Sequence, residues 1–183
     1  MKKLYFLIFV LLIVNVVSAQ DKLSGVLPLK DGKVIYSGII QLQGVSKDEI
    51  YKRVKIWFIN TYNSGKDVIQ FDDKESGEII GKGCFKEIWN INFFSSEYVN
   101  VWKTIKIKVK NDCLKYEITD IKIRNYFFPS PNASLTDLGT PIENWNKLRE
   151  SNNKRFFQKI DDQLNQLMRS LENEMKNKVE DRW

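Results

Sequence analysis

One segment in the second half of the chain alternates between apolar and charged residues, and this pattern limits the fold more than any other. Ile105, Ile107 and Val109 alternate with lysines, and Asn111-Asp112 then supplies a turn. A two-residue period predicts strands with one covered and one exposed face, and the short turn predicts an antiparallel hairpin. We therefore expect strands over residues 103–110 and 114–124.

The second strand of this hairpin changes phase partway along. Its apolar residues have even numbers up to Ile118, whereas Ile121 and Ile123 have odd numbers. One extra residue at Thr119 or Asp120 would return all of these side chains to the covered face. The sequence therefore predicts a β-bulge at one of these two positions.

The residues before this hairpin predict three further strands and one helix. The strands are expected over residues 34–42, 67–71 and 78–89, where apolar side chains alternate or lie between turn residues. Ser46 and Glu49 form a capping box that begins a helix, and Gly65 is a plausible left-handed residue to end it.

A second, longer helix is expected from about residue 142, after a loop that contains three prolines. Its apolar residues recur every three or four positions, as an amphipathic helix requires. They are Phe156, Ile160, Leu164, Leu167, Leu171 and Met175. The order strand, helix, four antiparallel strands, helix predicts an α+β fold with both helices packed on one face of the sheet.

Three short motifs resemble a known family. They are LPLKDGKV at residues 27–34, GVSKDE at 44–49 and DKESGEIIGKG at 73–83. Together they resemble exported bacterial domains of unknown function that have a TATA-binding-protein-like fold, over roughly residues 27–124. The resemblance implies the same order of elements and no catalytic residues, and the fold name does not carry DNA binding with it.

The N-terminus has the features of a secretory signal peptide. Lys2 and Lys3 precede an apolar run of about 14 residues, which is short for a membrane span of about 20. Small residues follow at Val17-Ser18-Ala19, so cleavage is expected before Gln20. An uncleaved anchor is the alternative. We expect residues 1–19 to be removed and residues 20–183 to form one exported domain, periplasmic or extracellular, with no transmembrane span.

The chain has no histidine. Ser-His and Cys-His catalysis and His-ligated metal sites are therefore excluded, while carboxylate pairs, lysine nucleophiles and all-oxygen metal sites remain open. One acidic group, at Asp72, Asp73, Glu75 and Glu78, lies at an expected hairpin turn. Four oxygen donors so close could bind Ca²⁺ loosely, but such residues are also ordinary turn formers. We expect no catalytic residue, no metal site and no cofactor.

Basic side chains should gather on the exposed face of the sheet. The candidate ligand-binding residues are Lys106, Lys108, Lys110, Lys122 and Arg124. Such a face could bind a polyanion, for example an acidic polysaccharide or lipid headgroups. Alternatively, the lysines only solvate the uncovered face and prevent aggregation.

Aromatic residues crowd the expected connection between residues 89 and 103. They are Trp89, Phe93, Phe94, Tyr98 and Trp102. They bind a partner if exposed and pack across hairpins if buried. No aromatic position is expected between the basic residues of the open face.

The two cysteines are not expected to form a disulfide. With a turn near Ser95-Ser96, Cys84 lies opposite Ile107, two strands away from Cys113 and on the other face. The expected separation is roughly 10 Å, beyond the limit of about 7 Å between bridged Cα atoms.

These observations favour a non-catalytic binding or interaction domain of the bacterial cell envelope. Its partner is then an unidentified protein or an acidic envelope polymer. The alternative is a carboxylate-dependent enzyme that acts on envelope glycans, although the strand pattern places no pair of facing acids. Nucleic acid is disfavoured by export and by a net charge of +6 that falls to +4 once Lys2 and Lys3 are removed.

Overall fold

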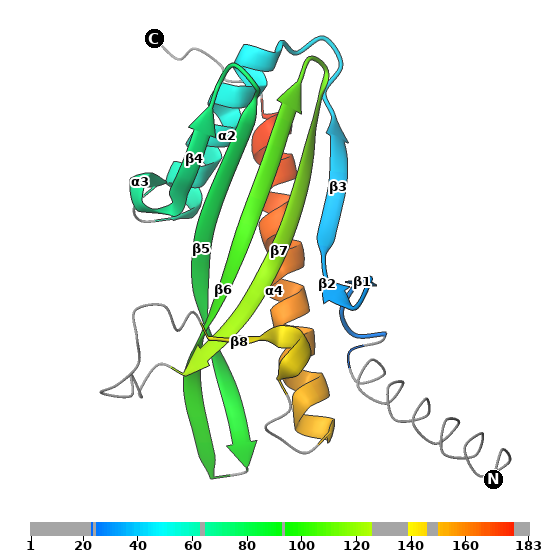
Figure 1. Cartoon of the computed structure of the whole chain (residues 1–183), viewed down its shortest axis with the longest axis vertical. Helices are drawn as coiled ribbons and strands as arrows, with labels where there is room; N and C mark the ends of the chain where they lie inside the picture. The colour runs from blue at the N-terminus through cyan, green and yellow to red at the C-terminus, as the bar shows by residue number, and fades with distance from the viewer. Residues whose placement is uncertain are drawn as a thin grey trace, which may run out of the picture.

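The computed structural model describes residue 23 and residues 25–62, 65–92, 94–125, 139–145 and 150–177. The expected signal peptide lies outside these residues. The main sheet is antiparallel, in the order β3-β7-β6-β5-β4 (Figure 1). Its strands are β3 (Tyr36–Gln41), β4 (Ile69–Asp73), β5 (Glu78–Asn92), β6 (Ser95–Lys110) and β7 (Cys113–Asn125). The short strands β1 (Leu29–Lys30) and β2 (Lys33–Val34) form a separate two-stranded sheet, and β8 (Thr140–Pro141) pairs with β7.

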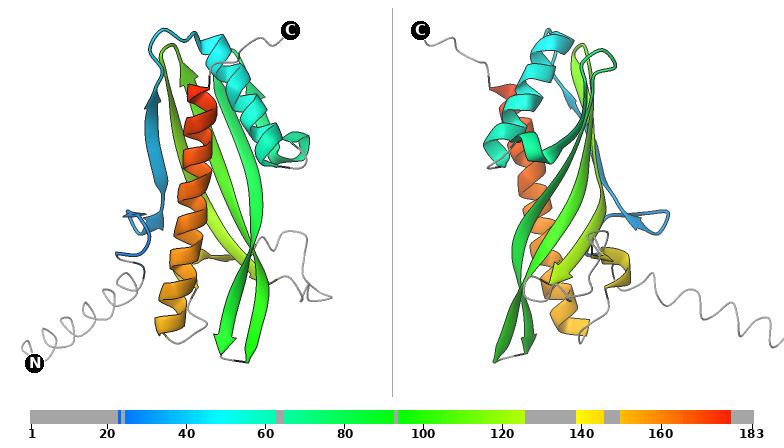
Figure 2. Two further views of the ribbon diagram at one scale, coloured as in Figure 1. Left: turned by 180° about the vertical axis from the view of Figure 1, so that it is seen from behind. Right: turned by 60° about the vertical axis from the view of Figure 1, so that its left-hand side comes forward.

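Two long helices cover one face of this sheet. They are α2 (Lys47–Thr61) and α4 (Glu150–Lys176), and the view from behind in Figure 2 shows both in front of the strands. The two are joined by hydrogen bonds from Trp57 Nε1 to Ser170 Oγ (2.9 Å) and from Arg53 Nη1 to the Met175 carbonyl (2.6 Å). The α+β architecture predicted from the sequence is therefore confirmed.

The apolar residues assigned to the covered face do form the core. Ile105, Ile107 and Val109 of β6 are almost fully buried, as are Phe58 of α2 and Ile160 of α4. The predicted stripe on α4 is likewise buried, apart from Leu167, which is partly buried.

The predicted bulge is present in β7. Thr104 pairs with Thr119 and Trp102 pairs with Lys122, so two residues of β7 face one residue of β6. Asp120 takes a positive φ of 53° within this step. The bulge keeps Ile118 and Ile121 on the same, covered face.

The start of the first helix is confirmed, but two predicted boundaries need correction: the last residue of the first helix and the first residue of the second. Ser46 Oγ accepts a hydrogen bond from the Glu49 amide (3.3 Å), as the capping box requires. Helix α2 nevertheless ends at Thr61, because Tyr62 leaves in an extended conformation, and Gly65 instead begins the short helix α3 (Gly65–Val68). The long helix begins at Glu150, after a 3-10 turn at Ile142–Asn144.

The predicted register of the β5–β6 hairpin is wrong. Cys84 lies opposite Trp102 and not opposite Ile107, since both strands continue to a turn between Asn92 and Ser95. Both cysteines are free. Cys84 pairs with position 102 of β6 and Cys113 pairs with position 110, and these two positions lie roughly 26 Å apart along the strand. The two cysteines lie on the same face of the sheet and not, as predicted, on opposite faces.

Candidate functional site

In the described part of the chain no long helix packs on the second face of the sheet, and basic side chains collect on it. Cross-strand partners share a face, so the strand register places each side chain. We call this set the basic face: Lys82, Lys86, Lys106, Lys108, Lys110, Lys115, Lys122 and Arg124. All five basic residues predicted from the sequence belong to it.

The positive charge of the basic face is only partly balanced. Lys106 Nζ lies 3.9 Å from Glu117, and Lys122 Nζ lies 3.0 Å from Asp120. Lys108 lies between two paired positions, Lys115 on β7 and Glu78 on β5. The like charges of Lys108 and Lys115 repel each other, and the carboxylate of Glu78 offsets only part of the positive charge in this row.

Two of the predicted aromatic residues lie on this same face, on β6 itself. Trp102 stands between Cys84 on β5 and Lys122 on β7, with Lys82 and Arg124 in the rows on either side. Tyr98 lies opposite Ile88, and these side chains are 49% and 40% exposed. The expectation that no aromatic residue lies between the basic ones is therefore wrong, because β6 begins at Ser95 and includes Trp102, whereas the strand was expected to begin at residue 103.

The remaining aromatic candidates occupy the far end of the β5–β6 hairpin. Phe94 lies in its turn and is 93% exposed. Phe93 and the side chain of Trp89 lie outside the part of the chain that the structure describes. The expected aromatic cluster is thus split between the hairpin turn and the open face.

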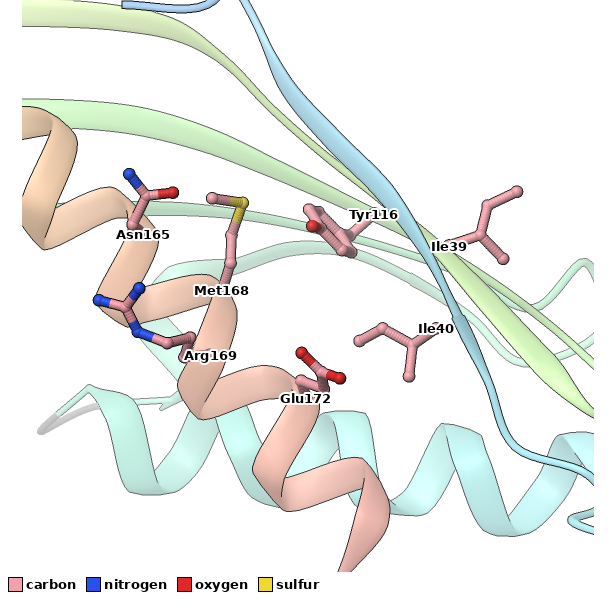
Figure 3. Close-up of a pocket in the computed structure, with 7 residues that line it drawn as sticks. All are labelled: Ile39, Ile40, Tyr116, Asn165, Met168, Arg169 and Glu172. Atoms are coloured by element: carbon pink, nitrogen blue, oxygen red, sulfur yellow. The ribbon is translucent and has the colours of Figure 1, made fainter.

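A cavity of about 240 Å³ lies at one edge of the sheet, between β3 and α4. It is lined by Ile39, Ile40, Tyr116, Asn165, Met168, Arg169 and Glu172. Figure 3 shows Ile40 and Glu172 pointing toward each other below the Tyr116 ring, whereas Ile39 points away. Apolar groups such as Ile40 and Met168 therefore line the cavity together with polar groups that come mainly from α4.

Gly38 allows Tyr116 to reach this cavity. A Cβ atom at position 38 would come within 2.5 Å of the Tyr116 hydroxyl, so any larger residue would displace the ring. Burial raises the pKa of Tyr116, and the negative charge of Glu172 raises it further. The hydroxyl is therefore a neutral hydrogen-bonding group at physiological pH.

A buried lysine lies under α2, on the covered face. Lys103 is 3% exposed, and its Nζ lies 4.7 Å from the Phe85 ring centroid and 5.4 Å from that of Tyr62. Burial lowers the pKa of Lys103 to about 8, although the nearby Cys84 thiol opposes the shift. Among the described residues, Lys103 has no carboxylate in ion-pair contact. Because it is buried, we assign Lys103 no part in a binding surface.

The acidic group at the β4–β5 turn is used for structure. Asp73 Oδ1 accepts hydrogen bonds from the Glu75 and Ser76 amides at 2.9 and 3.2 Å. Asp72 accepts hydrogen bonds from Tyr51 and Lys55. Burial alone would raise the pKa of Asp72, but these hydrogen bonds outweigh burial and lower it, which is the reverse of what a general acid needs.

Two negative findings apply to the described ranges alone. They contain no cluster of three or more Cys, Asp or Glu side chains arranged to hold a metal ion. In the same ranges, no helix is both long enough and apolar enough to cross a membrane.

Sequence reasoning missed Lys103 and the cavity beside β3. The signal for Lys103 was present, since it has the same parity as Ile105 and Ile107 and must face the helices. The cavity had no comparable signal, because Tyr116 and Arg169 belong to elements far apart in the sequence.

Comparisons with known proteins identify the fold. A DUF4468 family protein from Bacteroides ovatus matches with 19% identity and a TM-score of 0.58, over 86% of this chain and 94% of that one. A TBP-like protein from Parabacteroides distasonis matches with 17% identity and a TM-score of 0.52, over 81% and 98%. None of the curated proteins matches the sequence.

The sequence itself is matched by one family model, described as a domain of unknown function (DUF4468) with TBP-like fold. The match covers residues 36–124, from the start of β3 almost to the end of β7. The match contains the motifs at residues 44–49 and 73–83, whereas the motif at residues 27–34 lies before it. Residues 36–124 of this chain therefore match the DUF4468 family of domains of unknown function, and the fold is TBP-like.

Proposed function

We propose that this chain is an exported, non-catalytic binding domain of the bacterial cell envelope, and that its basic face binds an acidic polysaccharide. One observation carries the proposal: Trp102 lies on the open face with Lys122 beside it and with Lys82 and Arg124 in the neighbouring rows. An indole ring provides a flat apolar surface for a sugar ring, and the surrounding cations attract its carboxylates.

The chemistry of the chain supports a binding role over catalysis. The absence of histidine removes the commonest general base, and Asp72 and Asp73 are held by hydrogen bonds in the β4–β5 turn. An enzyme acting on glycans through carboxylates would need two facing acids about 5–10 Å apart, one of them with a raised pKa. The lowered pKa of both Asp72 and Asp73 argues against that alternative.

The first test removes charge from the central strand. Calorimetric titration with polygalacturonate, compared with uncharged dextran, would measure binding by the purified chain. The triple variant Lys106→Gln, Lys108→Gln, Lys110→Gln should bind polygalacturonate at least about fivefold more weakly, because three exposed cations are lost. Wild-type binding should also weaken as salt is added.

A matched control removes the same charge elsewhere. Lys52, Lys154 and Arg155 are exposed on the two helices, so their replacement by glutamine changes the net charge equally without touching the open face. Binding by this control should stay within about twofold of wild type, since only distant charges change. If the two triple variants lose affinity equally, or if neither does, the basic face only solvates the sheet and the proposal is wrong.

The contribution of Trp102 is tested separately. Trp102→Ala should weaken binding of polygalacturonate, while an anion without sugar rings, such as polyphosphate, should bind the variant as it binds wild type. Equal loss for both probes would mean that the tryptophan supports the strand rather than a sugar ring. The two probes thereby separate recognition of a sugar from attraction to charge.

A further inference from the structure

The two edges of the sheet are built differently. Strand β4 at one edge contains a register shift between Ile69 and Phe71 and ends in two aspartates. Strand β3 at the other edge reads YSGIIQ, with no charge and no proline, and pairs with β7 in unbroken register. In the described part of the chain, β3 has no strand on its outer side.

Natural proteins usually protect an edge strand against pairing with another chain. Charges, prolines, bulges and covering segments serve this purpose, and β4 has two of them. Strand β3 has none along its six residues, and Ile39 at its centre is 62% exposed. An uncharged, regular edge with an exposed isoleucine is the kind of edge that accepts another strand.

The charges beside β3 indicate which strand it accepts. Arg169 and Glu172 lie on α4 around the cavity next to β3 and carry opposite charges. Glu172 already contacts Lys176, whereas Arg169 has no ion-pair partner among the described residues. A surface with one charge of each sign is complementary to its own copy turned by a two-fold axis.

We propose that β3 pairs antiparallel with β3 of a second copy of this chain, which joins the two sheets into one. In such a dimer each Arg169 lies near Glu172 of the other copy. Directly paired residues share a face, so pairing centred on Ile39 sets this side chain against its own copy on the open face. The same register brings Ile40 of each copy to the side of the cavity, opposite Gly38.

Sedimentation velocity of the purified chain over a range of concentrations tests this dimer. Wild type should approach twice the monomer mass as its concentration rises. Ile39→Lys should weaken dimerisation at least about tenfold, since it places two ammonium groups against each other at the axis. Ile39 is largely exposed, so the variant should fold as wild type does, which thermal unfolding checks.

The opposite edge provides a matched control. Phe71 on β4 is 45% exposed, and Phe71→Lys makes the same kind of change there without affecting the dimer. If wild type stays monomeric at every concentration, or if Ile39→Lys dimerises like wild type, the proposal is overturned. If wild type is monomeric, the β3 edge is instead open to pairing with a strand of a different protein.

A charge exchange tests the contact between the helices. Arg169→Glu should weaken the dimer because two carboxylates then face each other, and adding Glu172→Arg should restore it. Failure of the double variant to recover would rule out this arrangement of α4. These measurements need no polysaccharide, so they are independent of the proposed binding function.

Discussion

Lys103→Met should raise the free energy of unfolding by about 2 kcal/mol at pH 7. Burial lowers the pKa of Lys103 from 10.5 to about 8, and this shift corresponds to a cost of about 3 kcal/mol for holding the charged amine in the fold. The contacts of the Lys103 amine with the Tyr62 and Phe85 rings offset about 1–2 kcal/mol of this cost. Methionine keeps part of that contact through its sulfur, so the variant should be more stable than wild type.

The same lysine should make stability depend on pH. Between pH 8 and about 10 the unfolded chain keeps the lysine proton that the folded chain has lost, so stability should rise with pH. Burial raises the pKa of Cys84 and of Tyr62, and both groups act in the opposite direction at high pH. Denaturant unfolding is therefore best compared between Cys84→Ser and Cys84→Ser/Lys103→Met, below pH 10.

The free energy of unfolding of the variant without the lysine should not rise between pH 8 and about 10. The difference in stability between the two proteins should therefore shrink from about 2 kcal/mol toward zero as the pH increases. Lys108→Met, on the exposed face of the same strand, is the control and should change stability little at any pH. If the stability of the two proteins, with and without Lys103, changed in parallel with pH, the pKa of the Lys103 amine would be the same in the folded and unfolded chain.

Local patterns in the sequence predicted the parts of the fold that local forces determine. The alternation of Ile105, Ile107 and Val109 with lysines follows from a sheet that is covered on one side only, and the structure confirms it. The Ser46 cap and the bulge at Asp120 were also readable, because each satisfies a backbone or packing requirement within a few residues.

The register of the long β5–β6 hairpin could not be predicted in this way. Ser95 and Ser96 resemble turn residues, yet they pair with Asn92 and Asn90 of β5, because the turn lies between Asn92 and Ser95. Trp102 was assigned to the connection before β6, because that strand was expected to begin only at residue 103. The basic residues of the candidate site were predictable from parity alone, whereas the position of the tryptophan among them depended on how far β6 extends toward the hairpin turn.

The cavity beside β3 shows a second limit of sequence reasoning. Its walls come from β3, β7 and α4, which meet only after the chain has folded. Gly38 leaves space on the covered face of β3, and the Tyr116 ring fills that space. A gap and the side chain that fills it can be matched only when the pairing of the strands is known.

Gly81→Ala should destabilise the protein by about 2 kcal/mol, although alanine in a strand usually improves on glycine by roughly 0.5–1 kcal/mol. A Cβ atom at position 81 would lie 2.6 Å from the Phe58 ring, which is fully buried and packed edge-on against Trp57 at 4.8 Å. Because Phe58 cannot move aside, the clash must shift α2 away from β5. Denaturant unfolding measures the loss, and Lys82→Ala, one residue along on the open face, should change stability by less than about 0.5 kcal/mol.

A double-mutant cycle with Phe58→Leu tests the cause of this effect. Phe58→Leu alone should cost about 1–2 kcal/mol through lost packing, but in the Gly81→Ala protein the smaller side chain makes room for the added methyl group. The double variant should therefore be more stable than the sum of the single changes predicts, by about 1 kcal/mol or more. Additive losses would mean that α2 packs on β5 without the contact between Phe58 and Gly81, and that the glycine is needed for the strand itself.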